Sequence, residues 1–306
     1  MNNSEFRIQN SEPNNGNEKT MQNGLPAETV IDVKGVKKMF RVYRDRGNTL
    51  KEIWAYRSMI QSLVHKDLRG RYQASVLGFL WTFIVPLCQL AVYSLMFSII
   101  MRGAAIDKFY LYVFVGLIPW NFFSACLTGG ASSVVAQQSL VNKIYFPREV
   151  VPLSYVTSSF VNMLLCEIIV ILVSIFSGVP FSILGYLCLP LVMLVEYIFA
   201  LGVTMLVSAI DVYFRDLEHI LGIIAMAWMF VTPIMYDSSI VAGSRWFSLY
   251  QLNPMNIIVT AYRDILYTGK VPELTKLAGL LGISIVLLWI GFRVFGKLKR
   301  RFSEVM

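Results

Sequence analysis

Long stretches of this chain contain no charged side chain. Residues 73–101, 109–142 and 219–236 hold no Asp, Glu, Lys or Arg, and residues 150–210 hold two acidic residues and no basic one. An α-helix needs about 20 apolar residues to cross the ~30 Å hydrocarbon core of a bilayer. Hydrophobic residues make up 56% of the chain and charged residues 15%, against about 25% charged in soluble domains. The chain is therefore expected to be an all-α integral membrane protein.

The uncharged runs divide into six expected transmembrane helices. The third and fourth come from one run, which we divide at Gly178-Val179-Pro180. Glycine tolerates unusual φ angles and proline lacks an N–H, so these residues favour a tight turn. The expected spans cover residues 76–101, 109–131, 151–177, 181–210, 219–236 and 274–295.

The basic residues predict the orientation of the spans. Of the 27 Lys and Arg residues, 21 fall on the side that holds both termini and six on the other side. Because cytoplasmic loops are enriched in Lys and Arg, we expect a multi-pass protein of the cell membrane with both termini cytoplasmic. Topology and attraction to anionic membrane lipids account for the net charge of +8. No nucleic-acid partner is predicted.

Three regions are expected. Residues 1–50 read as a polar, mostly disordered cytoplasmic extension, although residues 30–40 alternate like a strand. Residues 51–72 predict an amphipathic helix that lies at the membrane interface, and residues 73–306 the six-span domain. A helix packed on protein is the alternative for 51–72. The basic residues expected at lipid head groups are Arg57, Lys66, Arg69 and Arg71.

The connections between spans differ in character. The links at 137–152 and 211–219 are short, and we interpret them as docking points for a partner on the cytoplasmic side. The outer connection, 237–273, is too apolar for a free loop, so we expect a re-entrant outer gate of broken helices between spans five and six. An amphipathic segment resting on the outer leaflet is the alternative.

Motifs for chemistry on this chain are missing from the sequence. There is no G-x-x-x-x-G-K-[ST] phosphate loop and no hydrolase or metalloprotease motif. The four cysteines are read as small buried residues, and the two histidines lack ligand spacing, so no metal site is predicted. The intramembrane acids Glu167 and Glu196 suggest either a functional site or hydrogen bonds across helices, and the second reading is favoured.

Several separated motifs resemble one family, the permease subunits of ABC-2 type polysaccharide exporters, which move O-antigen, teichoic acid or capsule. The resemblance covers residues from about 50 to 306. The motifs are HKDLRGRYQASVLGFLWTFIVPL (65–87), VGLIPWNFF (115–123), SLVNKIYFPREVVPLS (139–154), DVYFRDLEHIL (211–221), TPIMY (232–236), LNPMNIIVTAYRDILYTG (252–269) and KRRFSEVM (299–306).

The resemblance implies a homodimer of this permease that binds two copies of a separate ABC ATPase subunit. ATP and Mg would belong to that ATPase, this chain would carry no cofactor and no catalytic residue, and the cargo would be a lipid-linked glycan. The implied ATPase-coupling residues are Leu140, Val141, Asn142, Lys143, Ile144, Tyr145, Phe146, Arg148, Glu149, Arg215 and Asp216. The implied outer-gate residues are Pro233, Asn253, Pro254, Tyr262, Arg263 and Asp264.

Two points stay open at this stage. The aromatic residues within spans are candidates for a lumen on which sugar rings stack, namely Trp81, Phe83, Tyr93 and Trp228. The competing functions are an ABC-2 exporter of drugs or lipids and, from a different class, a membrane-embedded glycosyltransferase. The second would require clustered acidic residues at a membrane face, and the nearest group, at 211–218, also contains an arginine.

Overall fold

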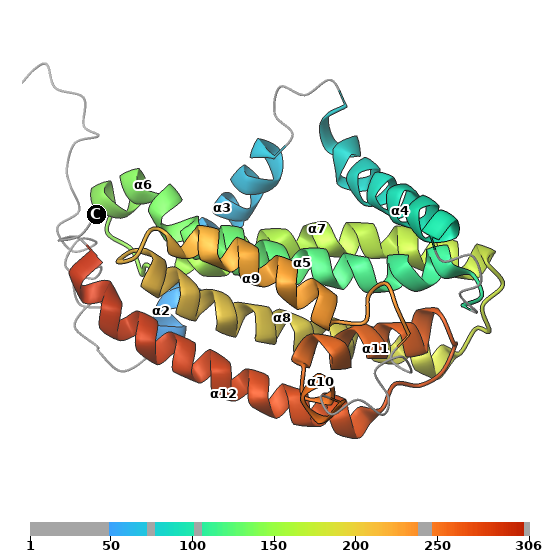
Figure 1. Ribbon diagram of the computed structural model, residues 1–306. Coiled ribbons are helices and arrows are strands. Elements are labelled where there is room, and N and C mark those ends of the chain that lie inside the picture. The colour runs from blue at the N-terminus through green and yellow to red at the C-terminus, as the bar shows by residue number, and fades with distance from the viewer. Residues whose placement is uncertain (1–48, 72–76, 101–105, 238–246, 303–306) are drawn as a thin grey trace, which may run out of the picture. The chain divides into compact units, whose positions relative to one another are not determined.

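The computed structural model describes residues 49–71, 77–100, 106–237 and 247–302 of the 306. Every regular element in these ranges is a helix (Figure 1). The helices are α2 (Thr49–Ala55), α3 (Arg57–Gly70), the 3₁₀ turn η1 (Gly78–Leu80), α4 (Trp81–Ile100), α5 (Phe109–Ala136), α6 (Gln138–Lys143), α7 (Val150–Phe176), α8 (Ile183–Asp211), α9 (Leu217–Val231), α10 (Phe247–Gln251), α11 (Pro254–Leu266), α12 (Leu274–Leu298) and the 3₁₀ turn η3 (Lys299–Arg301).

Residues from Leu50 onward form one compact unit. The extension predicted over residues 1–50 lies almost wholly outside the described residues.

Helix α5 lies at the centre of the helical bundle. It contacts α4, α7, α8, α9 and α11, and Figure 1 shows α7, α8 and α9 running alongside it. Between Leu111 and Leu127 nearly every side chain is buried. A helix that is apolar on all sides is stable at the centre of a bundle in a membrane, because neighbouring helices or lipid cover each of its faces. The uncharged run 109–142 therefore forms the core of the fold.

Four helical segments are long and apolar enough to cross a membrane: Phe109–Lys143, Val150–Phe176, Ile183–Asp211 and Leu274–Arg301. The other two expected spans form shorter apolar helices. Helix α9 has 15 residues, or about 22 Å at ~1.5 Å per residue, which is less than the ~30 Å of a hydrocarbon core. The protein is thus a helical multi-pass membrane protein, and the count of six spans stays a prediction.

The tight turn predicted between spans three and four is confirmed. Gly178 has φ +68°, a left-handed conformation that suits glycine. Ser182 then caps α8, because its side-chain oxygen accepts a hydrogen bond from Gly185 N at 3.3 Å. A Cβ added at Gly269 would lie 2.0 Å from the carbonyl oxygen of Pro180. This turn and the connection after α11 therefore touch.

Glycines allow α8 and α12 to approach closely. A Cβ added at Gly202 would lie 2.9 Å from Leu288 N, and one added at Gly291 would lie 2.9 Å from the carbonyl oxygen of Gly202. Small residues at helix crossings let backbones touch where lipid offers no hydrophobic drive for association. The C-terminal helix is consequently held along the length of α8.

The amphipathic helix predicted over 51–72 is present as α2 and α3, which are separated at Tyr56. Its apolar face packs on protein, since Met59, Ile60 and Leu63 contact the core and α3 contacts α7. Arg71 Nη2 also donates a hydrogen bond to the Ser159 hydroxyl of α7 at 3.0 Å. The structure thus shows the protein contact that the sequence left as an alternative, and a position at the membrane surface stays a prediction.

The cysteines follow the expectation only in part. Cys126 and Cys166 are buried and Cys188 is half-buried, but Cys88 is exposed. The prediction for Cys88 was wrong because the described part of α4 lies at the edge of the bundle, where its main helix contacts are with α5 and α7.

The connections gather at two ends of the bundle (Figure 1). The α6 end comprises α6, the segment 144–149, the link 212–216 and η3. The α11 end comprises the turn 177–182, α10, α11 and the segment 267–273. These two ends contain most of the residues that the sequence singled out for function.

Candidate coupling and gate elements

The segment from α6 to α7 presents side chains outward at the α6 end. Ile144 is 53% exposed and Tyr145 is 68% exposed, although both are apolar or aromatic. Asn142 and Lys143 are also exposed, while Val141 is buried and anchors the short helix. Exposed apolar side chains on a short, anchored segment are typical of a surface that another protein covers.

The second half of this segment is tied to the C-terminal part of the chain. Glu149 is 1% exposed and accepts a hydrogen bond from Lys299 Nζ at 2.5 Å. Arg148 donates to the backbone oxygen of Lys299, and its guanidinium lies 5.7 Å from the ring centre of Phe302. Phe146 is buried. Three of the predicted coupling residues, Phe146, Arg148 and Glu149, therefore also make contacts within this chain.

The link between α8 and α9 meets the same cluster. The Tyr213 hydroxyl donates to the backbone oxygen of Leu298 at 2.8 Å, and its ring lies 6.0 Å from that of Phe302. The two residues predicted to couple, Arg215 and Asp216, are exposed. The structure thus places both predicted coupling segments in contact with the residues 298–302 at the end of α12.

The basic residues predicted for the interface are exposed: Arg57, Lys66, Arg69 and Arg71. Arg57 lies 5.8 Å from the ring centre of Trp54, and Lys66 donates to Gln137 at 3.3 Å, close to α6. Arg71 also pairs with Asp67 at 3.1 Å. These contacts orient the helix. Arg57, Lys66 and Arg69 remain exposed, whereas the side chain of Arg71 is only 27% exposed.

At the opposite end, α11 begins with a well-formed cap. The side chain of Asn253 accepts a hydrogen bond from Met255 N at 3.1 Å, and Pro254 occupies the first turn, where its missing N–H costs nothing. The indole of Trp228 donates to the same Asn253 side chain at 2.9 Å. The sequence pair Asn-Pro therefore starts the helix and fixes it to α9.

Helix α11 packs into the bundle against α5 and α8, and most of its residues are buried. Its buried residues are Met255, Asn256, Ile258, Val259, Ala261, Tyr262, Arg263, Ile265 and Leu266. This burial is consistent with the predicted re-entrant segment, although the depth of α11 in a membrane stays a prediction.

Arg263 is the main polar anchor of α11. It is 6% exposed, its Nη1 donates to the Tyr112 hydroxyl at 2.8 Å, and its Nη2 donates to the Ile234 oxygen at 2.8 Å. The guanidinium also lies 3.5 Å from the ring centre of Tyr112. The hydroxyl of Tyr112 in turn donates to the Tyr236 oxygen at 3.0 Å. One side chain thus joins α11 to α5 and to the segment 232–236.

Tyr262 joins α11 to α8. Its ring is fully buried, and its hydroxyl donates to Glu196 Oε2 at 2.8 Å. The sequence favoured a hydrogen bond across helices for Glu196. The structure shows that its partner is Tyr262. Glu167 is 1% exposed, and within the described part of the chain neither of its carboxyl oxygens has a hydrogen-bond partner.

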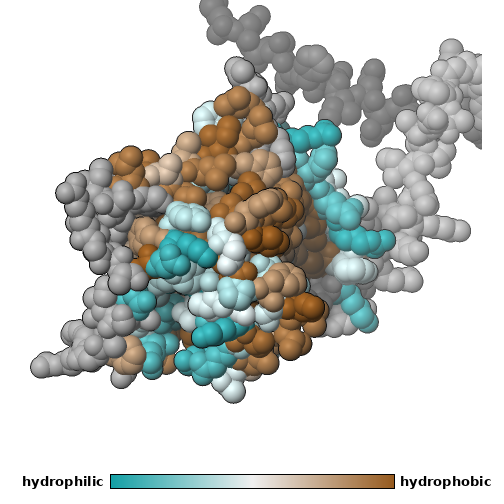
Figure 2. Space-filling model, turned by 90° about the vertical axis from the view of Figure 1, so that its right-hand side faces the viewer, coloured by the Kyte–Doolittle hydropathy of each residue, from teal (hydrophilic) through white to brown (hydrophobic). Residues whose placement is uncertain are grey.

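The other predicted residues of this end are close to these anchors. Pro233 is buried in the segment after α9, and Asp264 is half-buried on the outward face of α11. Figure 2 looks onto the α11 end, where hydrophilic residues gather in the middle of a surface flanked by hydrophobic ones. This pattern is the one expected of an end that faces water within an apolar belt.

The structure describes the side chains of three of the four aromatic candidates for a lumen. Trp228 packs edge-on against Phe123 at 5.1 Å, inside the chain. Trp81 and Phe83 are half-buried at the start of α4, and the side chain of Tyr93 lies outside the described residues. A path lined by these side chains within one protomer stays a prediction.

Some residues of these elements escaped sequence reasoning. Tyr112 stabilises the α11 end, and Lys299 and Phe302 stabilise the α6 end, yet each contacts a partner that is distant in the sequence. The sequence signal for Lys299 and Phe302 was the motif KRRFSEVM (299–306), which formed part of the family resemblance.

Comparison with known proteins decides the family. The model of a family described as ABC-2 type transporter matches residues 58–267. The chain belongs to the ABC-2 transporter family. This ABC-2 permease is 36% identical over 256 residues to the O-antigen export system permease protein RfbA of Myxococcus xanthus. The matched residues make up 83% of this chain and 98% of the relative.

Two further relatives are similar over most of their length. An O-antigen export system permease protein RfbA of Klebsiella pneumoniae is 32% identical over 246 residues, or 80% of this chain and 93% of the relative. The polysialic acid transport protein KpsM of Escherichia coli is 23% identical over 239 residues, which are 77% of this chain and 92% of the relative.

Proposed function

We propose that this ABC-2 permease is the membrane-spanning subunit of an ATP-driven exporter that moves a lipid-linked polysaccharide from the cytoplasmic to the outer face of the cell membrane. The observation that carries the proposal is its likeness, along nearly their whole length, to relatives named for O-antigen export. The exposed apolar side chains of the α6 end support a partner there.

In this proposal the α6 end faces the cytoplasm. Two copies of the permease enclose the path, and each receives one separate ATPase subunit over Ile144 and Tyr145, with Arg215 and Asp216 beside them. ATP and Mg are bound by the ATPase. The described part of the α6 end is rich in basic residues, which is consistent with a cytoplasmic position.

The movement would pass along rigid elements. A displacement of α6 reaches α12 through the Glu149–Lys299 pair, and α12 lies along α8 through its close glycine contacts. Helix α8 is joined to α11 by the Glu196–Tyr262 hydrogen bond. Packed elements with discrete contacts transmit a stroke better than loose loops do. In this mechanism α11 is the re-entrant outer gate, and α4 and α9 complete the six spans.

The test is to delete the gene in the native cells and measure polysaccharide on the cell surface and lipid-linked glycan inside. We expect the surface polymer to disappear and the lipid-linked form to accumulate, with both restored by the intact gene. Affinity purification from those membranes should recover an ABC ATPase in equal amount. Unchanged surface polysaccharide together with lost export of a drug or lipid would replace the proposal by the alternative ABC-2 function.

A further inference from the structure

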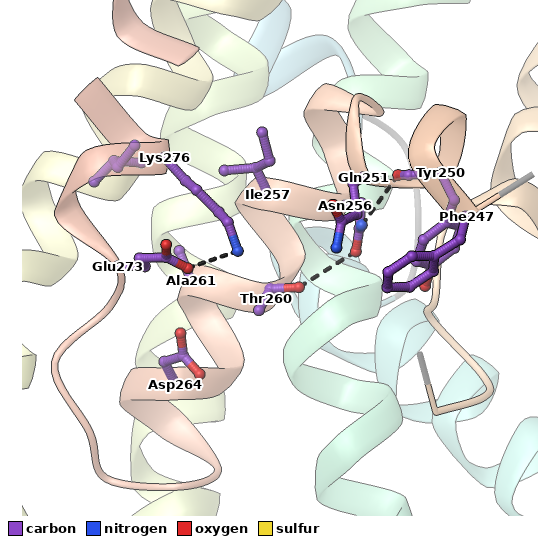
Figure 3. A pocket seen from close by; sticks show the side chains of 11 residues that line it. Phe247, Tyr250, Gln251, Asn256, Ile257, Thr260, Ala261, Asp264, Glu273 and Lys276 are labelled. Carbon is purple, nitrogen blue, oxygen red and sulfur yellow. Dashed lines mark hydrogen bonds and ion pairs between the residues drawn. The ribbon is translucent and has the colours of Figure 1, made fainter. Parts of the chain in front are cut away.

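A cavity of about 160 Å³ lies at the α11 end, between α10, α11 and the beginning of α12 (Figure 3). Its wall combines aromatic, amide, hydroxyl and charged side chains. This composition differs from the apolar surface expected against lipid, and it resembles that of small-molecule sites, in which a few polar groups are placed within an apolar wall. At ~30 Å³ per water molecule the cavity has room for about five waters, which is close to the size of one sugar ring.

One side of the cavity is aromatic. The rings of Phe247 and Tyr250 are stacked, with their centres 6.4 Å apart and an angle of 16° between their planes. Tyr250 is 6% exposed, so its position is fixed by packing. Burial raises the pKa of its hydroxyl above the usual range, so the ring stays neutral. A flat, neutral aromatic wall suits the apolar C–H face of a pyranose ring.

The middle of the cavity is a polar stripe on α11. Asn256, Thr260 and Asp264 follow one another at four-residue spacing, so they share one face of the helix. Thr260 Oγ1 donates to Asn256 Oδ1 at 3.3 Å, and Asn256 Nδ2 donates to the backbone oxygen of Tyr250 at 3.1 Å. These bonds hold the amide in place and leave lone pairs of the Thr260 oxygen available as acceptors. The side chain of Asp264 makes no hydrogen bond to another residue in the described ranges.

The side opposite the rings is charged. Glu273 and Lys276 form an ion pair at 2.6 Å at the beginning of α12, and both side chains are more than half exposed. Figure 3 shows this pair facing the cavity across Thr260, with Asp264 below it. The lining holds two carboxylates and one ammonium, and the ammonium of Lys270 acts on Asp264 from outside the lining. Carboxylates in the wall disfavour direct contact with an anionic group and provide several acceptors for hydroxyl groups.

We infer that this cavity is a binding subsite for one uncharged pyranose residue, reached by the polysaccharide as it leaves the exporter. The inference rests on the proposed function, because it is the export of a glycan that brings a sugar to this end. The more exposed ring of Phe247, supported by the buried ring of Tyr250, would stack on the sugar ring, while Thr260 and Asp264 would accept hydrogen bonds from its hydroxyls. The occupant would bridge α11 and α12 and so favour one position of the gate helix.

The test measures binding of neutral methyl glycosides of glucose, galactose, mannose and N-acetylglucosamine to the full permease–ATPase complex in nanodiscs, by saturation-transfer NMR. Methyl glucuronide is the anionic comparison. The variant Thr260→Phe fills the cavity from an exposed position of α11. Its matched control is Val271→Phe, at an exposed position that does not line the cavity.

We expect at least one neutral glycoside to bind to the wild type and to Val271→Phe. Thr260→Phe should weaken that binding at least tenfold, or about 1.4 kcal/mol. Methyl glucuronide should bind more weakly than the neutral sugar, and Asp264→Asn should reduce this difference. Thermal unfolding of each complex verifies that the variants are folded.

Several results would overturn the inference: no neutral glycoside binding to the wild type, equal binding to Thr260→Phe, or a preference for the glucuronide. The proposed function is tested separately by surface polysaccharide in the deletion strain. If export of polysaccharide depends on this chain but Thr260→Phe binds normally, the subsite alone is refuted. If the glycoside binds to the cavity but the deletion leaves export intact, the exporter assignment fails.

Discussion

The two ends of the bundle use polar and apolar side chains in opposite ways. At the α11 end the polar groups are buried and bonded inside the chain, with Arg263 joined to Tyr112 and Ile234, and Tyr262 joined to Glu196. At the α6 end the apolar groups are outside, with Ile144 and Tyr145 exposed. The comparison teaches that contacts within the chain hold α11 in place, whereas the exposed apolar side chains of the α6 end are those over which the proposed ATPase would bind.

The largest effect is expected at the α11 end. Arg263→Met removes the charged donor from three acceptors, the hydroxyl and backbone oxygens of Tyr112 and the backbone oxygen of Ile234, and the expected loss is about 3 kcal/mol of folding free energy. Thermal unfolding of the purified permease measures it. Arg293→Met is the matched control, because that exposed arginine only lies over the Trp289 ring, at 4.7 Å. Equal loss in the two variants would show that Arg263 is not the anchor.

The second largest loss of stability is expected when the ion pair between Glu149 and Lys299 at the α6 end is broken. Lys299→Met leaves the buried Glu149 carboxylate without its partner, so we expect a loss of about 2 kcal/mol. In Lys276→Met the broken ion pair is exposed at both partners, and the change should be within about 1 kcal/mol. Unfolding midpoints of both variants in the same detergent decide between the two outcomes. A smaller change for Lys299→Met than for Lys276→Met would contradict the buried contact.

A smaller effect is expected when the hydrogen bond between α11 and α8 is removed. Tyr262→Phe keeps the buried ring and removes only the donor to Glu196, which corresponds to about 1 kcal/mol. Tyr110→Phe removes a hydroxyl that meets Ser177 at an exposed site and should change less. Calorimetry of the purified proteins measures the stability change in each of these two variants. The proposed transmission to the gate also predicts slower polysaccharide export in Tyr262→Phe.

The smallest change in stability is expected for Tyr145→Ser, which should nevertheless strongly reduce binding of the proposed ATPase subunit. Tyr145→Ser changes an exposed side chain, so the folding free energy should move by less than about 0.5 kcal/mol. Recovery of the ATPase with the tagged permease should nevertheless fall at least tenfold. Leu252→Ser, which is 72% exposed at the α11 end, is the control that should recover the ATPase normally. Full recovery with Tyr145→Ser would remove this residue from the proposed interface.

The sequence predicted those features that depend on neighbouring residues. The helices over 109–136 and 150–211, the turn at Gly178 and the amphipathic segment before α4 were all readable from local patterns. The Asn-Pro cap of α11 was readable in the same way, although we used these residues only as part of a gate. The exposure of Cys88 was not readable, since hydropathy alone does not distinguish the edge of a bundle from its core.

By itself the sequence determined that this protein is a helical membrane protein of the ABC-2 family, because uncharged runs and short motifs are properties of contiguous residues. Only the tertiary structure decided which side chains meet: Arg263 with Tyr112, Glu196 with Tyr262, and Glu149 with Lys299. Each of these pairs joins residues more than sixty positions apart. Such contacts depend on how glycine-lined helices cross, and a single sequence does not report helix crossings.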